Sequence, residues 1–567
     1  MVALVTLTAA PDQPSAMSLL AVLPNQAEVA RIGAEALVVW AHRLYSGPSY
    51  WNPLRPDLLA EQHLADTAQL ALLATTAARL AGEQRYEAEL LTQLLTELTR
   101  GAQNQPAVQA ALDELLAATL PQIIVLVVTT GHADLADLVS LALQLAPQPG
   151  LAALLAEQVP YPSVQLAALA ATLASQQVAH YRAGTINEDP DTTNRLAESL
   201  NTLAARLAAL GRLEEALAAS EEATGIYREL TETRPGAFRP DLAMSLHNLA
   251  IRLAALGRHE DALAASEEAV IIRRDEARAH PDELRPDLAS SLNNLAAHLG
   301  RLGRREEALA AIDEATGIYR ELAEANPGAF RSGLAMSLHN LADHMRDLGR
   351  LEGALAASDE ATGIYRELAE ANPGAFRSDL ATALNTLAGH MGDLGRLERA
   401  LAASDEATGI YRELADARPD AFRPDLAMSL NIQAARLAGL GRREDALAAV
   451  DEATGIFREL AEARSEAYRP ELATSLNNLS ANLADLGRRE DALAAVEEAV
   501  IIRRELAGTR PDAFRPDLAS SLNHLAARLG DLGRRESSLA AVEEATGIYR
   551  ELARPGRTRS GPAWPAR

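Results

Sequence analysis

The sequence predicts an all-α protein, a right-handed α-α superhelix of stacked repeats preceded by an irregular helical region. The main observation is a glycine that recurs every 46 residues without insertion or deletion, at Gly211, Gly257, Gly303, Gly349, Gly395, Gly441, Gly487 and Gly533. Such a period indicates stacked repeats, because one repeat cannot bury its own apolar face. The composition agrees: 48% of the residues are hydrophobic, chiefly Ala and Leu, and only 4% are aromatic.

Each repeat is expected to hold two helices. In the sixth repeat we place the first at Leu426 to Leu440 and the second at Glu444 to Ala463, since apolar residues recur in both at the spacing of a helix that buries one stripe. Gly441 between them is expected to end the first helix with a left-handed backbone. Asp425 is a candidate N-cap, and Pro419 is expected to stop the preceding helix.

A second glycine lies inside the second helix, at Gly455 in the sixth repeat, where it costs about 1 kcal/mol relative to Ala. Six repeats keep this glycine, while Ile271 and Ile501 replace it in repeats two and seven. Close approach of another helix would explain the glycine, and recent duplication of the repeats would explain its pattern.

These repeats resemble the tetratricopeptide repeat (TPR). The family's large and small packing residues around a turn glycine fall on Leu249, Ala250, Leu253, Gly257, Ala262 and Ala269. With a long second helix and Leu-His-Asn-Leu at 246–249 and 338–341, the repeats are most similar to the kinesin-light-chain type. The resemblance covers about 195–553 and implies a TPR solenoid whose first helices line a concave surface.

The rest of the chain has less regular patterns. We divide the sequence into an N-terminal segment with one helix, an irregular α-helical arm, eight 46-residue repeats and a disordered tail, at 1–50, 51–190, 191–553 and 554–567. The β-branched run Ile123 to Val128 is interpreted as helix rather than strand, because its neighbours are helical and no partner strand is apparent. The uncharged runs 138–156 and 158–179 are interpreted as buried helices, since Pro, Gln and Ser interrupt them.

One N-terminal stretch resembles a different family. Trp40, Leu44-Tyr45 and the run Leu54 to Leu64 are similar to the segment that opens the helical sensor arm of bacterial NOD-like (STAND) signalling ATPases. The ATPase domain itself is not found in this chain. The resemblance therefore implies a sensor arm without its motor.

Composition excludes several functions. The net charge of −25 opposes binding to nucleic acid or anionic membranes. There is no cysteine and all 53 basic residues are Arg, which rules out thiolate chemistry, a P-loop lysine and Schiff bases. Arg31 is the first basic residue, so no secretory signal is evident. We expect a cytoplasmic protein without cofactor or metal.

Candidate binding residues lie on the first helices. Ten residues before each turn glycine stands a mostly amide column: Asn201, His247, Asn293, His339, Asn385, Asn431, Asn477 and Asn523. An amide offers both a donor and an acceptor, which suits a peptide backbone, and in the resembled family such Asn ladders hold extended peptides. The alternative is that these amides satisfy carbonyls of nearby loops.

A second column, two residues before each turn glycine, reads Ala209, Ala255, Arg301, Asp347, Asp393, Gly439, Asp485 and Asp531, and Asp343 lies one turn earlier in repeat four. Its acidic later part predicts a ligand with Arg or Lys side chains. The alternative is an ordinary solvated face of an acidic protein.

The fourth repeat suggests a metal site and a hydrolase site, and we favour neither interpretation. His339, Asp343 and Asp347 follow one helical stripe and resemble a weak metal site, but the other repeats lack this set, which favours drift. Ser337 and His339 suggest a hydrolase, yet neighbouring positions on one helix point apart. We therefore predict no catalytic residue and no metal.

An aromatic residue followed by Arg recurs before the first helices, at Phe238-Arg239, Phe330-Arg331, Phe376-Arg377, Phe422-Arg423, Tyr468-Arg469 and Phe514-Arg515. We expect the ring to pack beneath the connector and the Arg to pair with an acidic neighbour. An aromatic–cation contact is the alternative.

Together these observations predict a non-catalytic protein–protein interaction scaffold that binds a partner peptide or helix in the concave groove. The alternative is the sensor arm of a split or degenerate STAND-type ATPase. An enzyme in residues 1–190 is disfavoured, because no paired carboxylate, Ser/His or Gly-rich signature appears there. The sequence leaves the oligomeric state open.

Overall fold

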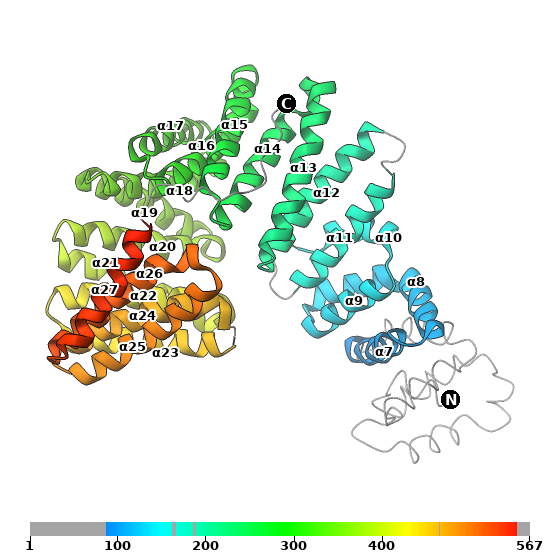
Figure 1. Ribbon diagram of the computed structural model, residues 1–567. Coiled ribbons are helices and arrows are strands. Elements are labelled where there is room, and N and C mark those ends of the chain that lie inside the picture. The colour runs from blue at the N-terminus through cyan, green and yellow to red at the C-terminus, as the bar shows by residue number, and fades with distance from the viewer. Residues whose placement is uncertain (1–86, 161–165, 185–188, 464, 553–567) are drawn as a thin grey trace, which may run out of the picture. The chain divides into compact units, whose positions relative to one another are not determined.

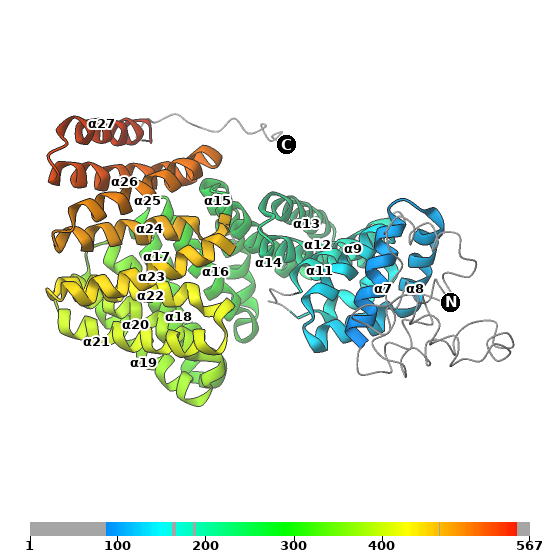
Figure 2. The same cartoon turned by 90° about the horizontal axis from the view of Figure 1, so that it is seen from below.

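The computed structural model describes residues 87–160, 166–184, 189–463 and 465–552. The described residues form helices and no strand, in two compact parts that divide between Ile272 and Arg273 (Figure 1 and Figure 2). The solenoid fold class is therefore confirmed. The stretch that resembles the STAND sensor arm, the N-terminal segment and the tail from residue 554 lie outside the described residues, and the proposed domain boundaries stay predictions.

The N-terminal part opens with irregular helices. These are α7 (Glu87–Ala102), α8 (Pro106–Thr130), α9 (Ala133–Leu145), α10 (Pro149–Leu155) with a 3-10 turn at Ala156–Gln158, and α11 (Ala167–Gly184). The run Ile123 to Val128 lies in α8, so the helical interpretation is confirmed. Pro121 sits inside α8 without ending it.

Among the described residues, α8 is the one helix long and apolar enough to cross a membrane by length and composition. This is weak evidence for a span, because the core helix of a soluble domain meets the same test. Half of its most apolar window is buried, and Leu112, Leu115 and Ile124 belong to one core with residues of α9 and α11.

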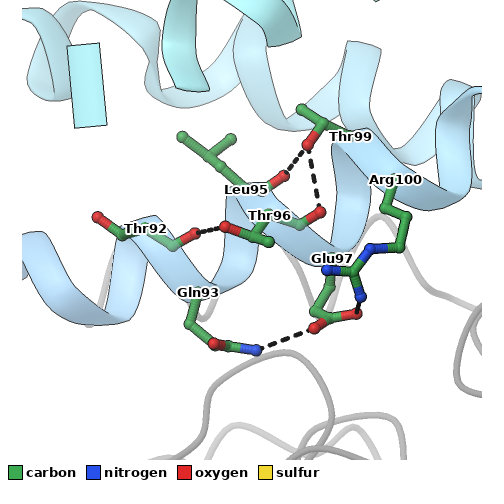
Figure 3. A network of polar contacts seen from close by, with 7 residues as sticks. All are labelled: Thr92, Gln93, Leu95, Thr96, Glu97, Thr99 and Arg100. Carbon is green, nitrogen blue, oxygen red and sulfur yellow. Dashed lines mark hydrogen bonds and ion pairs between the residues drawn. The ribbon is translucent and has the colours of Figure 1, made fainter. Parts of the chain in front are cut away.

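A buried carboxylate in α7 is satisfied within its own helix (Figure 3). Gln93 Nε2 donates to Glu97 Oε1 over 3.1 Å, and Arg100 Nη1 donates to Glu97 Oε2 over 3.4 Å. The Thr99 hydroxyl donates to the Leu95 carbonyl one turn earlier, over 2.7 Å. These polar groups support the helix, and we assign them no chemistry.

The eight repeats follow as helix pairs. Repeats one and two comprise α12 (Pro190–Ala209), α13 (Leu213–Thr233), α14 (Pro235–Ala255) and α15 (His259–Ala279), the last of which contains the division between the two parts. Repeats three to eight comprise α16 (Pro281–Arg301), α17 (Arg305–Ala325), α18 (Pro327–Asp347), α19 (Leu351–Ala371), α20 (Pro373–Asp393), α21 (Leu397–Ala417), α22 (Pro419–Gly439), α23 (Arg443–Ala463), α24 (Ser465–Asp485), α25 (Arg489–Thr509), α26 (Pro511–Asp531) and α27 (Arg535–Leu552). Figure 2 shows α22 to α27 stacked pair upon pair.

The turn between the two helices is confirmed. All eight turn glycines have φ between 69° and 77°, in the left-handed region. At the sixth repeat, Gly441 N–H donates to Ala438 O over 2.9 Å and Arg442 N–H donates to Leu437 O over 3.0 Å, which satisfies carbonyls at the end of α22. The second helix α23 also begins within one residue of the predicted position.

The predicted start of the first helix was wrong. α22 begins at Pro419 rather than Leu426, Arg418 is its N-cap residue, and Asp425 lies inside the helix. A proline at the first helical position has a suitable φ and no N–H that needs a partner. Pro419 therefore starts this helix as well as ending the one before, and Pro424 is tolerated inside it.

The first helices line the inner side of the stack in the C-terminal part. Successive first helices, such as α20 and α22 or α24 and α26, lie nearer to one another than successive second helices do. Small residues allow close packing, as Ala427 and Ala446 are fully buried beside the buried Leu430. The surface of the first helices is accordingly the concave one.

The glycine inside the second helix is not explained by close packing. A β-carbon built at Gly225, Gly317, Gly363, Gly409, Gly455 or Gly547 would meet no atom within 4 Å. The close-approach explanation is therefore wrong, and duplication remains. The replacing residues Ile271 and Ile501 are exposed, as expected for an open position.

We expect Gly363→Ala, Gly409→Ala and Gly455→Ala each to raise the free energy of unfolding by about 0.5–1 kcal/mol, because alanine loses less backbone entropy on folding and meets no neighbour. Urea denaturation of the single and triple variants measures the effect. Gly333→Ala is the control and should lower the stability, since the ring of Tyr319 occupies the place of its β-carbon. A loss of stability in the triple variant would contradict the open-space explanation.

Candidate functional site

The amide column lies on the first helices as predicted, at corresponding turns of α12 to α26. Asn293 and Asn477 are buried, Asn523 is exposed, and the other members are half-buried. In the C-terminal part these positions therefore lie on the inner surface of the stack. In the N-terminal part, Asn201 and His247 hold the same register.

The asparagine side chains also connect successive repeats. A serine of the following repeat donates to the asparagine Oδ1, over 3.3 Å for Ser245 and Asn201, 3.1 Å for Ser337 and Asn293, 3.2 Å for Ser429 and Asn385, and 3.3 Å for Ser475 and Asn431. The alternative interpretation expected these amides to bond to loop carbonyls. The partners that the structure shows are serine hydroxyls of the following repeat. The Oδ1 atom of each of these amides is thus already used, and its N–H groups are the donors that a ligand could accept from. The Nδ2 atoms of Asn201 and Asn293 are buried without a partner.

The same serines bond to a threonine of the preceding second helix. Thr408 Oγ1 lies 2.9 Å from Ser429 Oγ, and Thr454 Oγ1 lies 2.8 Å from Ser475 Oγ. A buried Thr–Ser–Asn chain thus crosses these repeat interfaces. Sequence reasoning missed this chain, although the columns could have been found by aligning the repeats at 46 residues.

Where one residue of this Thr–Ser–Asn hydrogen-bond chain is replaced, a neighbouring position is replaced as well. In repeats two and seven, Val270 and Val500 replace the threonine, and arginine replaces the aromatic residue three positions later. Arg273 Nη1 then donates to Ser291 Oγ over 2.7 Å, and Asn477 Nδ2 donates to Ser521 Oγ over 2.8 Å. Ala383 replaces the serine in repeat five, and the preceding repeat has His339 in place of the asparagine.

The acidic column is solvent-facing. Asp347, Asp393, Asp485 and Asp531 are exposed, as is Arg301 in the third repeat. Asp531 lies 3.5 Å from Arg528 Nε within α26. Carboxylates at the ends of successive first helices therefore border the inner surface of repeats four, five, seven and eight.

A histidine cluster surrounds Asp343. Asp343 Oδ1 lies 3.6 Å from His390 Nε2, and Asp343 Oδ2 lies 4.0 Å from His339 Nε2. Burial lowers the pKa of His339. Burial raises the pKa of Asp343, but the nearby His390 and His339 side chains outweigh it, so the net pKa lies below its usual value.

This cluster includes an unpredicted Ser–His–Asp arrangement, with Ser358 Oγ 2.6 Å from His390 Nδ1. Ser358 and His390 are only 2% and 1% exposed, so a substrate cannot reach the hydroxyl. Ser337, considered from the sequence, is buried and bonded to Asn293 and Thr316. Within the described ranges, no group of three His, Asp or Glu side chains is placed to hold a metal ion.

Five arginines of the aromatic–Arg pairs form ion pairs between repeats, as predicted. Arg331 and Arg377 lie 2.6 and 2.5 Å from Glu367 and Glu413, and Arg423, Arg469 and Arg515 make the equivalent pairs with Glu459, Glu505 and Glu551. The rings are half-buried, apart from the buried Phe238. Two rings do contact a cation, but from the preceding turn: Arg418 over Phe422 and Arg510 over Phe514, at 4.9 and 5.0 Å.

A second ladder of ion pairs joins successive second helices. Arg320 and Glu360, Arg366 and Glu406, and Arg412 and Glu452 each lie about 3 Å apart on the outer side. Exposed pairs of this kind contribute about 0–1 kcal/mol each. The outer side thus carries repeated charge pairing, and the inner side carries amides and carboxylates.

Comparison with known proteins agrees with this geometry. The tetratricopeptide repeat family model matches residues 196–233, 242–282, 288–327, 472–513 and 518–553. The chain therefore contains tetratricopeptide repeats, a class that is generally non-catalytic. The comparison with curated proteins finds no match.

Similar solved structures include tandem-repeat helical proteins. BtubC (BKLC) from P. vanneervenii is 21% identical, with a TM-score of 0.36 over 46% of this chain and 98% of its own. A Podosopora anserina kinesin light chain protein with nearly identical TPR-like repeats is 18% identical, with a TM-score of 0.32 over 40% and 99%. A Rap protein complexed with competence and sporulation factor is 16% identical, with a TM-score of 0.42 over 72% and 99%. These similarities concern the fold alone.

Proposed function

We propose that this protein is a non-catalytic interaction scaffold that binds a partner peptide or helix along the inner surface of its first helices. The observation that carries the proposal is the juxtaposition of an amide column with exposed carboxylates on that surface. Repeat solenoids generally bind partners on their concave side. With a net charge of −25, the proposal includes a basic ligand and a cytoplasmic location, without nucleic acid or membrane binding.

The asparagines are the part of the proposal to test first. We expect peptides selected from a random display library on the full chain to lose about tenfold in affinity for Asn385→Ala/Asn431→Ala, because a ligand backbone loses two amide partners. Fluorescence anisotropy with the selected, labelled peptides measures this loss.

Ser429→Ala/Ser475→Ala is the matched control, since it removes the same two inter-repeat hydrogen bonds but leaves both asparagines in place. Thermal melting of both variants separates lost stability from lost binding. Selected peptides that bind all three proteins equally would show that the ligand lies elsewhere.

The alternative function, a sensor arm of a split STAND-type ATPase, rests on Trp40, Leu44-Tyr45 and the run from Leu54 to Leu64. An ATPase gene directly upstream, and co-purification of its product with this chain, would favour it. Independent expression without such an ATPase would favour the free-standing scaffold.

A further inference from the structure

The inner surface of repeats six to eight contains a cavity of about 440 Å³. Its apolar wall includes Met428, Ile432 and Phe457, and its polar wall includes Glu471, Thr474 and Arg503. Asn431 of the amide column also borders it, so the cavity opens from the predicted binding surface. None of these residues except Asn431 was singled out from the sequence.

A substitution removes a polar contact on the apolar side. In repeat five, the Tyr411 hydroxyl lies 2.6 Å from Thr382 Oγ1 and donates to Ser378 O over 3.3 Å. In repeat six, phenylalanine (Phe457) stands at the register of Tyr411, and Met428 stands at the register of Thr382. The hydroxyl pair is thus replaced by an aromatic ring and a thioether chain, which leaves an apolar wall.

In a second substitution, a glutamate replaces an aspartate beside this wall, which makes the carboxylate side chain one carbon longer. Glu471 stands sixteen residues before its turn glycine, where repeats two, three, five, six and eight have aspartate. Its Oε2 atom is buried and accepts no hydrogen bond from the described residues. A buried carboxylate oxygen without a donor is costly, and a cation beside this carboxylate would offset part of that cost.

The other charged side chains at the cavity are Arg436, Arg503 and Asp517. Arg503, 6% exposed, donates to Asp517 Oδ2 over 2.9 Å and to Thr474 Oγ1 over 2.6 Å. Its Nε atom is buried without a hydrogen bond, and the guanidinium interacts with Glu471 electrostatically but gives its Oε2 no hydrogen bond. The chain of Arg436 borders the cavity, while its guanidinium lies over Gly392 of the preceding repeat. Among the described groups at the cavity, Glu471 is therefore the carboxylate with an oxygen that accepts no hydrogen bond.

We propose that this cavity takes an arginine or lysine side chain of the ligand bound on the first helices. The aliphatic part of that side chain packs against Met428, Ile432 and Phe457, and its cationic head pairs with the carboxylate of the half-buried Glu471 at the cavity wall. The inference rests on the proposed function and deepens it, since it assigns the basic character of the ligand to one position in the repeats.

The test uses N-acetyl-arginine methylamide as a probe of the full chain, with the neutral isostere N-acetyl-citrulline methylamide for comparison. We expect ligand-observed saturation-transfer NMR to show about tenfold tighter binding of the arginine probe, because a charge-assisted hydrogen bond is lost in citrulline. Glu471→Gln should abolish this preference. Asp425→Asn, which removes a carboxylate at the same register beside a tyrosine, should retain it.

Phe457→Tyr provides an independent variant, since it restores the tyrosine that repeats one, three, four, five and eight have at this position. We expect the added hydroxyl to occupy the cavity, so that the protein melts normally but binds the arginine probe about tenfold less tightly.

Equal binding of the two probes, no binding of either, or an unchanged preference in Glu471→Gln would each overturn the inference. If Glu471→Gln has no effect while the asparagine variants lose selected peptides, the cavity is wrong and the scaffold proposal stands. A Glu471-dependent preference without any selected peptide would leave the cavity as a site and remove the wider groove.

Discussion

Replacing Tyr411 by alanine is expected to lower the free energy of unfolding by about 3–5 kcal/mol, the usual cost of removing a buried aromatic side chain. Tyr411 is 4% exposed, and its hydroxyl is hydrogen-bonded to Thr382. Burial raises its pKa to about 12, which agrees with a phenol enclosed by the protein. The variant would leave a cavity between α20, α21 and α22 that these helices cannot close without losing other contacts.

Tyr549 is the matched control for this substitution. It occupies the same register in the last repeat but is 43% exposed, so Tyr549→Ala should cost less than about 1 kcal/mol. Tyr411→Phe should cost about 1 kcal/mol, since it removes only the hydroxyl. Urea denaturation measures the totals, and hydrogen exchange locates the loss, because repeat proteins unfold locally. Similar losses at positions 411 and 549 would contradict the packing described.

The double charge swap Asp347→Arg/Asp393→Arg is expected to weaken binding of basic peptides at least about 100-fold. Both carboxylates are exposed at the ends of α18 and α20. Replacing attraction by like-charge repulsion at two neighbouring positions costs several kcal/mol. Anisotropy titration with peptides selected on the original protein measures the change, and the difference should shrink at high salt.

The control for this swap is Glu370→Arg/Asp416→Arg, which changes the net charge equally. Both residues are exposed near the ends of the second helices α19 and α21. We expect a small effect there, because the added charges lie off the inner surface. An equal loss in both double variants would mean that overall charge, rather than the acidic column, attracts the peptides.

Helix boundaries show where sequence reasoning succeeds and fails. The turn glycines and the second helices were predicted closely, because a left-handed turn and an apolar stripe are local properties. The first helix was predicted to begin at Leu426, seven residues too late. In a sequence, a proline can indicate the end of one helix or the first residue of the next. Only one residue separates α21 from α22, so Pro419 does both.

The candidate site was predicted in part. The period placed the asparagine and aspartate columns on the first helices, and the structure places those helices on the inner side of the C-terminal stack. The serine that each Oδ1 accepts from was not foreseen. Asn385 and Ser429 are 44 residues apart and belong to different repeats, so only their stacking brings the two atoms within 3.2 Å.

The sequence alone determines the repeat class, the number of repeats, the turn geometry and the acidity of the first helices, since each depends on local spacing or on composition. The tertiary structure alone decides which polar atoms already have partners and which remain for a ligand. Phe457 and Glu471 are visible in the sequence as departures from the repeat, but they lie on α23 and α24, in successive repeats. Whether such departures create a cavity with a carboxylate oxygen that accepts no hydrogen bond depends on how neighbouring helices pack, which no single repeat specifies.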